Sequence, residues 1–355
     1  MTTPQLAELT LQLCRIPSET GTEARLADWV EARCRAAAGE AAVRRIGDSV
    51  VCAPAPEPAD ARPTVALVGH LDTVRCAAEQ DYAVRHGRVY GCGASDMKAG
   101  LAVMLALLDE RRALTRARPV WVFYAGEEGA DAGNELEPVL RSGALPALDL
   151  AFVLEPTDQT LMLGAMGTLH ATLTVRGTRA HSARPWQGEN ALLRAVPLLQ
   201  RLQALQRREV RIGELSFYEV MVPTQAATAN SRNVVPDALA LNVNVRFAPG
   251  RRAEDAAAEL RALAGPDVEV EVVDQAPAGD VCLDHPLLDA WRRREHLAVQ
   301  PKQAWTDVAR LTAHGIPAVN FGPGETAQCH QAQEWCSLPS LEFAYGALWR
   351  FFTAG

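Results

Sequence analysis

The sequence has no long apolar run, no Cys-x-x-Cys pair and no excess of basic residues. A membrane-spanning helix needs a run of about eighteen apolar residues, so none is expected here. A formal net charge of −8 excludes the basic face with which nucleic-acid-binding proteins attract phosphates. The first residues also lack the basic and apolar regions of a secretory signal peptide. These absences predict a cytoplasmic protein with neither a nucleic-acid nor a membrane partner.

The eight cysteines are scattered along the chain. Closely spaced cysteines are typical of small secreted domains, and Cys-x-x-Cys pairs are typical of zinc and redox sites. In a chain of 355 residues we therefore expect reduced cysteines that mostly pack in the interior. The same length allows one large or two medium domains, and an apolar fraction of 48% suffices for a core.

An apolar, β-branched stretch at 64–68 predicts a buried strand that runs into Gly-His-Leu-Asp-Thr at 69–73. His70 and Asp72 then stand at the C-terminal end of this strand, and its two-residue repeat points them to the same side. A carboxylate beside a histidine fixes the imidazole tautomer for metal binding or proton transfer. Alone, the motif fits a solvated loop histidine equally well. The other motifs of the chain decide between the two interpretations.

Two further predicted strands end in acidic residues. The strand at 120–124 is followed by Glu127 and Glu128, and the strand at 150–154 is followed by Glu155. In open α/β sheets, ligands bind at the carboxyl ends of the strands. We therefore expect these glutamates to line a functional site rather than only to solvate a loop.

Two more candidates flank predicted helices and strands. Asp96 precedes a predicted helix at 101–108, where it is expected to cap the helix, to bind a ligand, or to do both. His330 follows a predicted strand at 316–321. Both residues are thus expected at the same edge of the sheet as the strand-end acids.

The candidate ligands are His70, Asp96, Glu128, Glu155 and His330. If Asp96 bridges two metals, each metal receives one histidine, one glutamate and the shared carboxylate. Three protein ligands with an open position are typical of a catalytic zinc site, and nitrogen and oxygen donors also suit Co²⁺ or Mn²⁺. Glu127 is left over beside a ligand, where a general base is needed to take a proton from water. Asp72 is left over to orient His70.

The hydrophobic pattern of the sequence changes after about residue 164. Half-buried strands with alternating apolar residues are predicted at 169–175 and 238–247, whereas the buried strand pattern resumes near Cys282. We therefore predict an α/β fold in which residues 1–164 and 282–355 form a catalytic domain. Residues 165–281 form an inserted α+β unit.

Five motifs resemble, in order and spacing, the dizinc amidohydrolases of the M20 metallopeptidase family. They are His70-Leu-Asp72, Gly-x-x-Asp96, Glu127-Glu128, Glu155-Pro156 and His330. The resemblance covers nearly the whole chain. It implies a mixed-sheet, zinc-exopeptidase-like catalytic domain with helices on both faces and a lid or dimerisation domain. It also implies two divalent metal ions, for which Zn²⁺ is preferred over Co²⁺ or Mn²⁺. Glu127 is implied as the general acid/base. The implied metal sets are His70, Glu155 and Asp96 for one ion, and Glu128, His330 and Asp96 for the other.

The inserted unit carries further residues that match the family. The segment 176–185 resembles its Gly-x-x-x-His-Ser motif, which makes His181 a candidate oxyanion stabiliser, presented by the partner in a homodimer or brought to the site when the inserted unit closes. Asn233 and Arg246 match positions that contact the substrate, and a guanidinium suits a carboxylate. Thr306 falls in a segment that contacts the product.

Within the family, four segments look most like succinyl-diaminopimelate desuccinylases of the actinobacterial type. They start at Glu155, Ala180, Trp305 and Val319. This likeness implies hydrolysis of N-succinyl-LL-2,6-diaminopimelate, a small N-acyl amino acid of lysine and diaminopimelate biosynthesis. Met166 departs from the pattern, because other desuccinylases of the family carry an arginine there. Deacetylation of N-acetylornithine or N-acetyl-lysine, dipeptidase or carboxypeptidase activity, and a non-catalytic binding role stay as alternatives.

Overall fold

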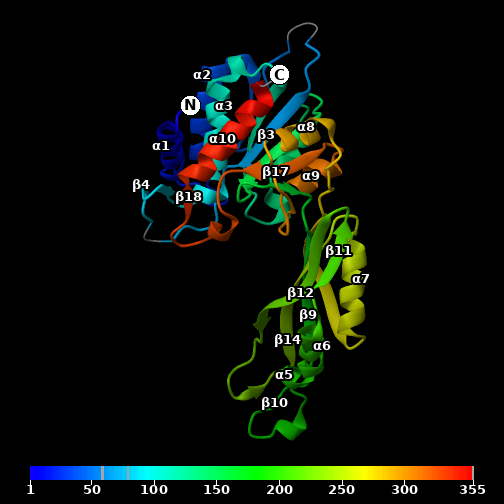
Figure 1. Ribbon diagram of the computed structural model, residues 1–355. Helices are drawn as coiled ribbons and strands as arrows, with labels where there is room; N and C mark the ends of the chain where they lie inside the picture. Colours follow the sequence, from blue (N-terminus) through cyan, green and yellow to red (C-terminus); the bar gives the residue numbers. More distant parts are fainter. Residues whose placement is uncertain (57–59, 78–79, 354–355) are drawn as a thin grey trace. The chain divides into compact units, whose positions relative to one another are not determined.

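The computed structural model describes residues 1–56, 60–77 and 80–353, and its chain forms two compact units (Figure 1). The first unit comprises Met1–Gly164, Asp280–Gln300 and Arg310–Gly355. The second comprises Ala165–Gly279 and Pro301–Ala309. The second unit therefore interrupts the first in sequence, and it also takes a short segment from beyond the insertion expected at 165–281.

An eight-stranded mixed sheet with the order β1-β2-β6-β3-β7-β17-β8-β16 forms the centre of the first unit. Its strands are β1 (Val43–Ile46), β2 (Ser49–Cys52), β3 (Thr64–His70), β6 (Arg118–Tyr124), β7 (Leu150–Pro156), β8 (Leu161–Leu163), β16 (Val299–Pro301) and β17 (Ala318–Gly322). Strands β6, β3, β7 and β17 are parallel neighbours, so their C-terminal ends share one edge. Every residue of β3 and β7 is buried, as expected for parallel strands that are covered on both faces.

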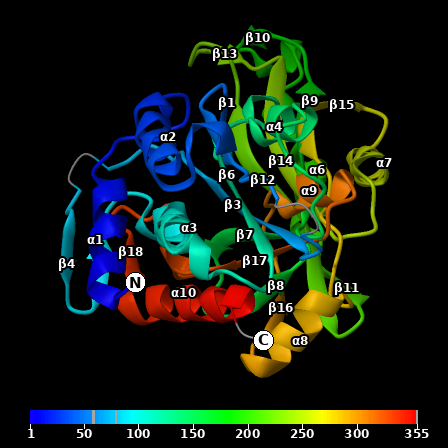
Figure 2. The same cartoon turned by 90° about the horizontal axis from the view of Figure 1, so that it is seen from above.

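Helices and a small antiparallel sheet complete the first unit. The helices are α1 (Thr3–Cys14), α2 (Ala24–Ala38), α3 (Ala99–Asp109), α4 (Leu136–Arg141), α8 (Pro286–Arg294), α9 (Val308–Ala313) and α10 (Leu338–Thr353). The small sheet contains β4 (Ala83–Arg85), β5 (Arg88–Tyr90) and β18 (Trp335–Ser337). Figure 2 shows α1, α3 and α10 together on one side of the large sheet. Gly100 allows α3 to approach β7 closely, because a Cβ there would collide with the carbonyl oxygen of Leu154.

A five-stranded antiparallel sheet with the order β11-β12-β14-β9-β15 forms the second unit. Its strands are β9 (Gly167–Arg176), β11 (Arg208–Ile212), β12 (Leu215–Ala227), β14 (Ala238–Phe247) and β15 (Val268–Ala276). Alternate residues of β9 and β14 are buried. They pack with α5 (Ala191–Arg194), α6 (Val196–Ala204) and α7 (Ala253–Ala264) around one apolar core. The alternation predicted from the sequence thus marks the face that the helices cover.

Two local features differ from the sequence-based expectations. Residues 191–205, whose amphipathic pattern predicts a single helix, are divided into α5 and α6, with Pro197 in the first turn of α6. Cys76 and Cys92 form a disulfide, so the expectation of reduced cysteines is wrong for this pair. The loops that carry the two cysteines are brought together by the fold, and no sequence spacing signals that proximity. None of the helices in the described ranges has the length and apolarity that a membrane crossing requires.

Trp291 anchors α8 to the core of the first unit. Its buried ring makes edge-on contacts with Phe152, Phe321 and Phe351 at centroid distances of 5.2, 4.9 and 5.6 Å. Its indole Nε1 donates a hydrogen bond to the carbonyl oxygen of Ala347 in α10, at 3.0 Å. One side chain therefore joins β7, β17, α8 and α10 through both packing and a hydrogen bond.

We predict that Trp291→Ala lowers the free energy of unfolding by about 3–5 kcal/mol, the usual loss for a buried aromatic residue. Trp291→Phe keeps much of the packing but loses the hydrogen bond to the Ala347 carbonyl, so it should cost less, about 0.5–1.5 kcal/mol. Denaturant unfolding followed by circular dichroism measures both. Equal losses in the two variants would contradict a role that combines packing with the hydrogen bond.

Candidate metal centre

The five predicted ligands meet at the C-terminal edge of the parallel strands. His70 ends β3, Glu128 follows β6, Glu155 lies near the end of β7, His330 lies beyond β17, and Asp96 lies in the turn before α3. Together with Glu127 they form three groups of three residues, in each of which the potential ligand atoms lie within 4.8 Å of one another. Residues separated by up to 260 positions thus converge on one small volume.

The first group contains His70, Asp96 and Glu155, and all three are buried. The Nε2 atom of His70 lies 3.2 Å from Oδ1 of Asp96 and 3.9 Å from Oε1 of Glu155. In a tetrahedral site with metal–ligand distances of about 2.1 Å, two ligand atoms are about 3.4 Å apart. The spacing of this group therefore fits a single divalent ion.

The second group contains Asp96, Glu128 and His330. The Nε2 atom of His330 lies 3.0 Å from Oε1 of Glu128 and 3.6 Å from Oδ2 of Asp96. His330 has a φ of 62°, a left-handed backbone conformation that non-glycine residues adopt mainly in turns and at functional sites. This group has the same donor types and spacing as the first.

Asp96 belongs to both groups through different atoms. Its Oδ1 faces His70, whereas its Oδ2 faces His330. A carboxylate with one oxygen on each side is the arrangement that a ligand shared by two ions requires. The two sets implied by the sequence motifs are therefore both assembled, and their role in binding metal stays a prediction.

Asp72 orients His70 of the first group through contacts with its Nδ1 atom. The Nδ1 atom of His70 donates to the carbonyl oxygen of Asp72 at 3.0 Å and lies 3.5 Å from its Oδ1, which leaves Nε2 to face the ligands. Strand β3 ends at His70, so Asp72 acts from the loop and not from the strand. Its carboxylate also accepts the backbone N–H groups of Glu127 at 3.0 Å and Glu128 at 2.9 Å. This second contact, which places the Glu127–Glu128 turn, was not foreseen from the sequence.

Glu127 is half-buried beside the ligands. Its carboxylate lies within 4.8 Å of ligand atoms of His70 and Glu128. This position allows two roles, a general base next to the ions or an additional ligand. The two groups around Asp96 already provide three ligands each, and the role of Glu127 as general base stays a prediction.

Hydrogen bonds and burial shift the pKa values in this region in opposite directions. Burial of the His70 imidazole opposes protonation, but the hydrogen bonds to Asp72 and Asp96 outweigh it and raise the pKa of His70. The hydrogen bond to Glu128 raises the pKa of His330 to about 9. Both shifts report an excess of negative charge around the imidazoles, which is the environment that a divalent cation would neutralise.

Asp96 does not cap α3. The helix starts at Ala99, and Asp96 lies in a preceding turn with φ of −119° and ψ of 93°, which are not helical angles. The expectation that Asp96 caps the helix is therefore wrong. The turn instead takes its backbone contacts from Glu334, a residue to which the sequence analysis assigned no role.

The remaining predicted residues belong to the second unit. His181 lies in β10 (Ala180–His181), which pairs with β13 (Val234–Val235), and the adjacent Ser182 N–H donates to the carbonyl oxygen of Asn233 at 3.0 Å. His181 and Asn233 are therefore neighbours on an exposed surface. Half-buried Arg246 lies on β14, where burial lowers its pKa, and Thr306 is buried in 301–309. The catalytic and substrate-binding roles of these four residues stay predictions.

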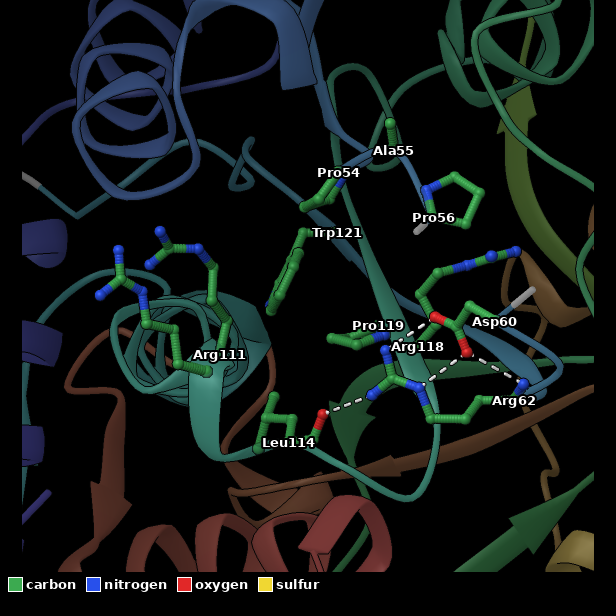
Figure 3. A pocket seen from close by; sticks show the side chains of 11 residues that line it. Pro54, Ala55, Pro56, Asp60, Arg62, Arg111, Leu114, Arg118, Pro119 and Trp121 are labelled. Atoms are coloured by element: carbon green, nitrogen blue, oxygen red, sulfur yellow. Dashed lines mark hydrogen bonds and ion pairs between the residues drawn. The ribbon is translucent and has the colours of Figure 1, made fainter. Parts of the chain in front are cut away.

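The first unit also has a cavity of about 540 Å³ at the opposite edge of the sheet (Figure 3). Its lining includes Arg118 at the start of β6 and Arg62 ahead of β3. Arg62 holds Asp60 with two guanidinium hydrogen bonds of 2.9 and 2.7 Å. The cavity contains none of the predicted ligands, so cavity size does not locate the metal centre in this chain.

Comparison with known proteins identifies the family. The model of peptidase family M20/M25/M40 matches residues 66–354. The chain belongs to this family. It is 38% identical over 352 residues to a Mycobacterium tuberculosis protein that is provisionally named a succinyl-diaminopimelate desuccinylase, with 97% of each chain covered. It is also 34% identical over 345 residues to the succinyl-diaminopimelate desuccinylase of Corynebacterium glutamicum, with 94% of this chain and 92% of that protein covered.

Solved structures share the fold of this M20 hydrolase. A tripeptidase from Staphylococcus aureus superposes with a TM-score of 0.81 at 20% sequence identity, covering 99% of this chain and 98% of that one. An M20 family metallo-carboxypeptidase from Sulfolobus solfataricus superposes with a TM-score of 0.77 at 14% identity, covering 98% of both chains. The α/β fold with its large mixed sheet, expected from the sequence, is thereby confirmed.

We predict that Asp96→Ala weakens metal binding at both sites, because it removes an oxygen from each group. Glu155→Ala removes a ligand from the first group alone and should leave one site close to wild-type affinity. Calorimetric titration with Zn²⁺, with bound metal counted by mass spectrometry, distinguishes the two patterns. An Asp96→Ala protein that keeps one site at unchanged affinity would show that the carboxylate is not shared.

Proposed function

We propose that this M20 hydrolase removes the succinyl group from N-succinyl-LL-2,6-diaminopimelate, acting in the cytoplasm as a homodimer with two divalent cations. The observation that carries the dimetal part is the placement of the two Asp96 oxygens toward separate histidine–glutamate pairs. The donors are nitrogen and oxygen atoms, for which Zn²⁺ is the best fit and Co²⁺ or Mn²⁺ are substitutes. The named desuccinylases at 38% and 34% identity support the substrate.

The chain's own residues account for the remaining steps of amide hydrolysis. Two bound cations would polarise the amide carbonyl and make water more acidic. His70, Asp96, Glu128, Glu155 and His330 would hold them. Glu127 takes the proton from the attacking water and then gives it to the leaving amine, as a general base and acid. Asp72 keeps the Glu127 backbone and the His70 ring in place through its backbone and carboxylate contacts.

The second unit supplies candidates for substrate binding. Arg246 suits a carboxylate, since its guanidinium can bind both oxygens. The Nδ1 atom of His181 accepts the N–H of Ala183 at 3.0 Å, so the neutral ring carries its proton on Nε2. That exposed N–H is suited to donate to the negative charge that develops on the amide oxygen.

The choice of acyl group and amino acid is tested with a substrate panel on the Zn²⁺- or Co²⁺-loaded protein. We expect kcat/KM for N-succinyl-LL-2,6-diaminopimelate to exceed that for N-acetylornithine, N-acetyl-lysine and dipeptides. The succinyl group has an extra carboxylate, and a hydrogen bond to a charged group changes kcat/KM about 10–100-fold. We expect the preference to have this size. Glu127→Gln should lose about 10²–10⁴-fold in kcat, whereas Glu137→Gln, a control on α4, should not.

Each outcome of the panel has a defined meaning. A preference for an acetylated substrate would overturn the succinyl assignment and would agree with Met166 standing where a basic residue was expected. Activity of Glu127→Gln within tenfold of wild type would overturn its role as the base. Release of free amine, followed by a colorimetric assay, measures all of these rates.

The proposal of a homodimer is based on the surface of the second unit. Leu192, Leu193, Val196 and Leu199 of α5 and α6 are exposed by 38–70%. In the described part of the chain, β11 pairs with β12 only at Leu215–Glu219, so residues 220–227 of β12 have a strand partner on one side. An apolar helix face beside an open strand edge is suited to pair with a second copy of the chain.

We predict that His181→Ala keeps two metals but loses about 10²–10³-fold in kcat, the effect of losing one oxyanion donor. The neighbouring exposed Ser182→Ala is the control and should keep its rate. If the partner subunit presents His181, mixing the His181→Ala and Glu127→Gln proteins should restore activity, since each mixed dimer has one intact site. Verified mixed dimers without recovered activity would exclude the arrangement across subunits.

A further inference from the structure

Glu334 is a buried carboxylate whose oxygens bind the backbone of the Asp96 turn. Its Oε2 accepts the N–H of Gly93 at 2.9 Å, and its Oε1 accepts those of Ser95 at 2.7 Å and Asp96 at 2.8 Å. The side chain is among the buried charged groups, with a residue exposure of 3%. Its own main-chain carbonyl also accepts the N–H of Gly91 at 3.1 Å. One residue therefore binds four backbone groups of a single turn.

The Asp96 turn needs such a partner because it is not a regular helix. Asp96 and Met97 have non-helical backbone angles, so the N–H groups ahead of α3 cannot be paired in the usual helical way. Buried N–H groups without an acceptor are strongly unfavourable. The carboxylate of Glu334 accepts three of them at once, and this fixes the backbone from which the Asp96 side chain extends.

The contact links the two histidine groups of the metal centre. Glu334 lies four positions after His330, whereas the hydrogen-bond partners of its side chain lie 238 to 241 positions earlier in the chain. A displacement of the 330–334 segment would therefore move the shared carboxylate and His330 together. The backbone geometry around Asp96 therefore depends on this connection.

Asp72 has the equivalent role for the turn that contains Glu127 and Glu128. It accepts the N–H groups of Glu127 and Glu128, as Glu334 accepts those around Asp96. Lys98 is almost fully buried near both carboxylates, and its Nζ donates to the carbonyl oxygen of Ile16 at 2.9 Å. Asp72 thus holds the Glu127–Glu128 turn and Glu334 holds the Asp96 turn. The Lys98 side chain lies near both carboxylates.

We infer that Glu334 is a positioning residue of the metal centre, which holds Asp96 so that each of its oxygens faces one histidine group. This inference rests on the proposed function, because it assigns Glu334 a role toward the ions. Both Glu334 oxygens are directed at backbone N–H groups of the turn, so the inference gives Glu334 no role as a ligand. Glu334 is also absent from the metal-capable groups found among the described residues.

The test is metal binding by Glu334→Gln. The amide keeps the size of the side chain, but its NH₂ group must face the Gly93 N–H or the N–H groups of Ser95 and Asp96. We expect the affinity for Zn²⁺ to fall about 10–100-fold at both sites, the usual effect of removing an outer partner of a metal ligand. Excess Zn²⁺ should restore activity, which a general loss of folding would not allow. In Co²⁺-loaded protein, the spectroscopic signature of coupling between the two ions should weaken.

Glu325→Gln is the matched control. Glu325 is a half-buried carboxylate in the neighbouring loop that accepts one backbone N–H, from Ser337 at 3.2 Å, and its side chain does not bind the Asp96 turn. Its metal affinity should stay at the wild-type value. If Glu334→Gln does not fold, Glu334→Asp replaces it. That variant keeps the charge but is too short to reach all three N–H groups, so it should also bind Zn²⁺ more weakly.

The outcomes separate this inference from the proposed function. A wild-type protein that binds fewer than two ions would contradict the dimetal function itself. A wild-type protein that binds two ions, with a folded Glu334 variant that binds them equally tightly, would overturn the positioning role and leave the function intact. Weaker binding in the Glu334 variant alone, with activity restored by excess metal, supports the inference.

Discussion

Negative charge concentrated at one edge of a parallel sheet is the constraint on which the rest of this structure depends. The carboxylates involved are those of Asp72, Asp96, Glu127, Glu128, Glu155 and Glu334, all buried or half-buried. Like charges this close, in surroundings of low dielectric constant, repel strongly unless cations or donors neutralise them. Backbone N–H groups stabilise Asp72 and Glu334, which lie behind the ligands. The carboxylates in front face the Nε2 atoms of two histidines, His70 toward Asp96 and His330 toward Glu128, and divalent cations would neutralise them further.

The fold divides the task of holding these groups between two kinds of structure. The parallel strands fix where each ligand segment leaves the sheet, and their buried, close-packed side chains allow little movement. The loops beyond the strands are irregular, so their backbone needs other acceptors. Asp72 and Glu334 provide them, and each one therefore places a ligand turn without being a ligand. Positional accuracy at the centre thus depends on buried polar contacts as well as on apolar packing.

The sequence was informative where position follows directly from local pattern. His70, Glu128 and Glu155 could be placed at one edge of the sheet because each adjoins a short apolar run, and the carboxyl ends of parallel strands meet there. Glu334 could not be found in this way, because its role consists of backbone contacts with a turn 238 positions away. The Cys76–Cys92 disulfide likewise depends on two loops that only the fold brings together. Strand β12 escaped prediction because its second half is mostly exposed and includes Pro223, so the burial alternation that marks its first half stops.

Anomalous X-ray diffraction from crystals of the Zn²⁺-loaded protein would locate the bound ions. We expect two zinc peaks that flank Asp96, one beside His70 and Glu155 and the other beside Glu128 and His330, with one Asp96 oxygen directed at each. Glu127 should contact neither ion directly. A single peak, or a second ion held by Glu127 in place of Asp96, would show that the carboxylate is not shared.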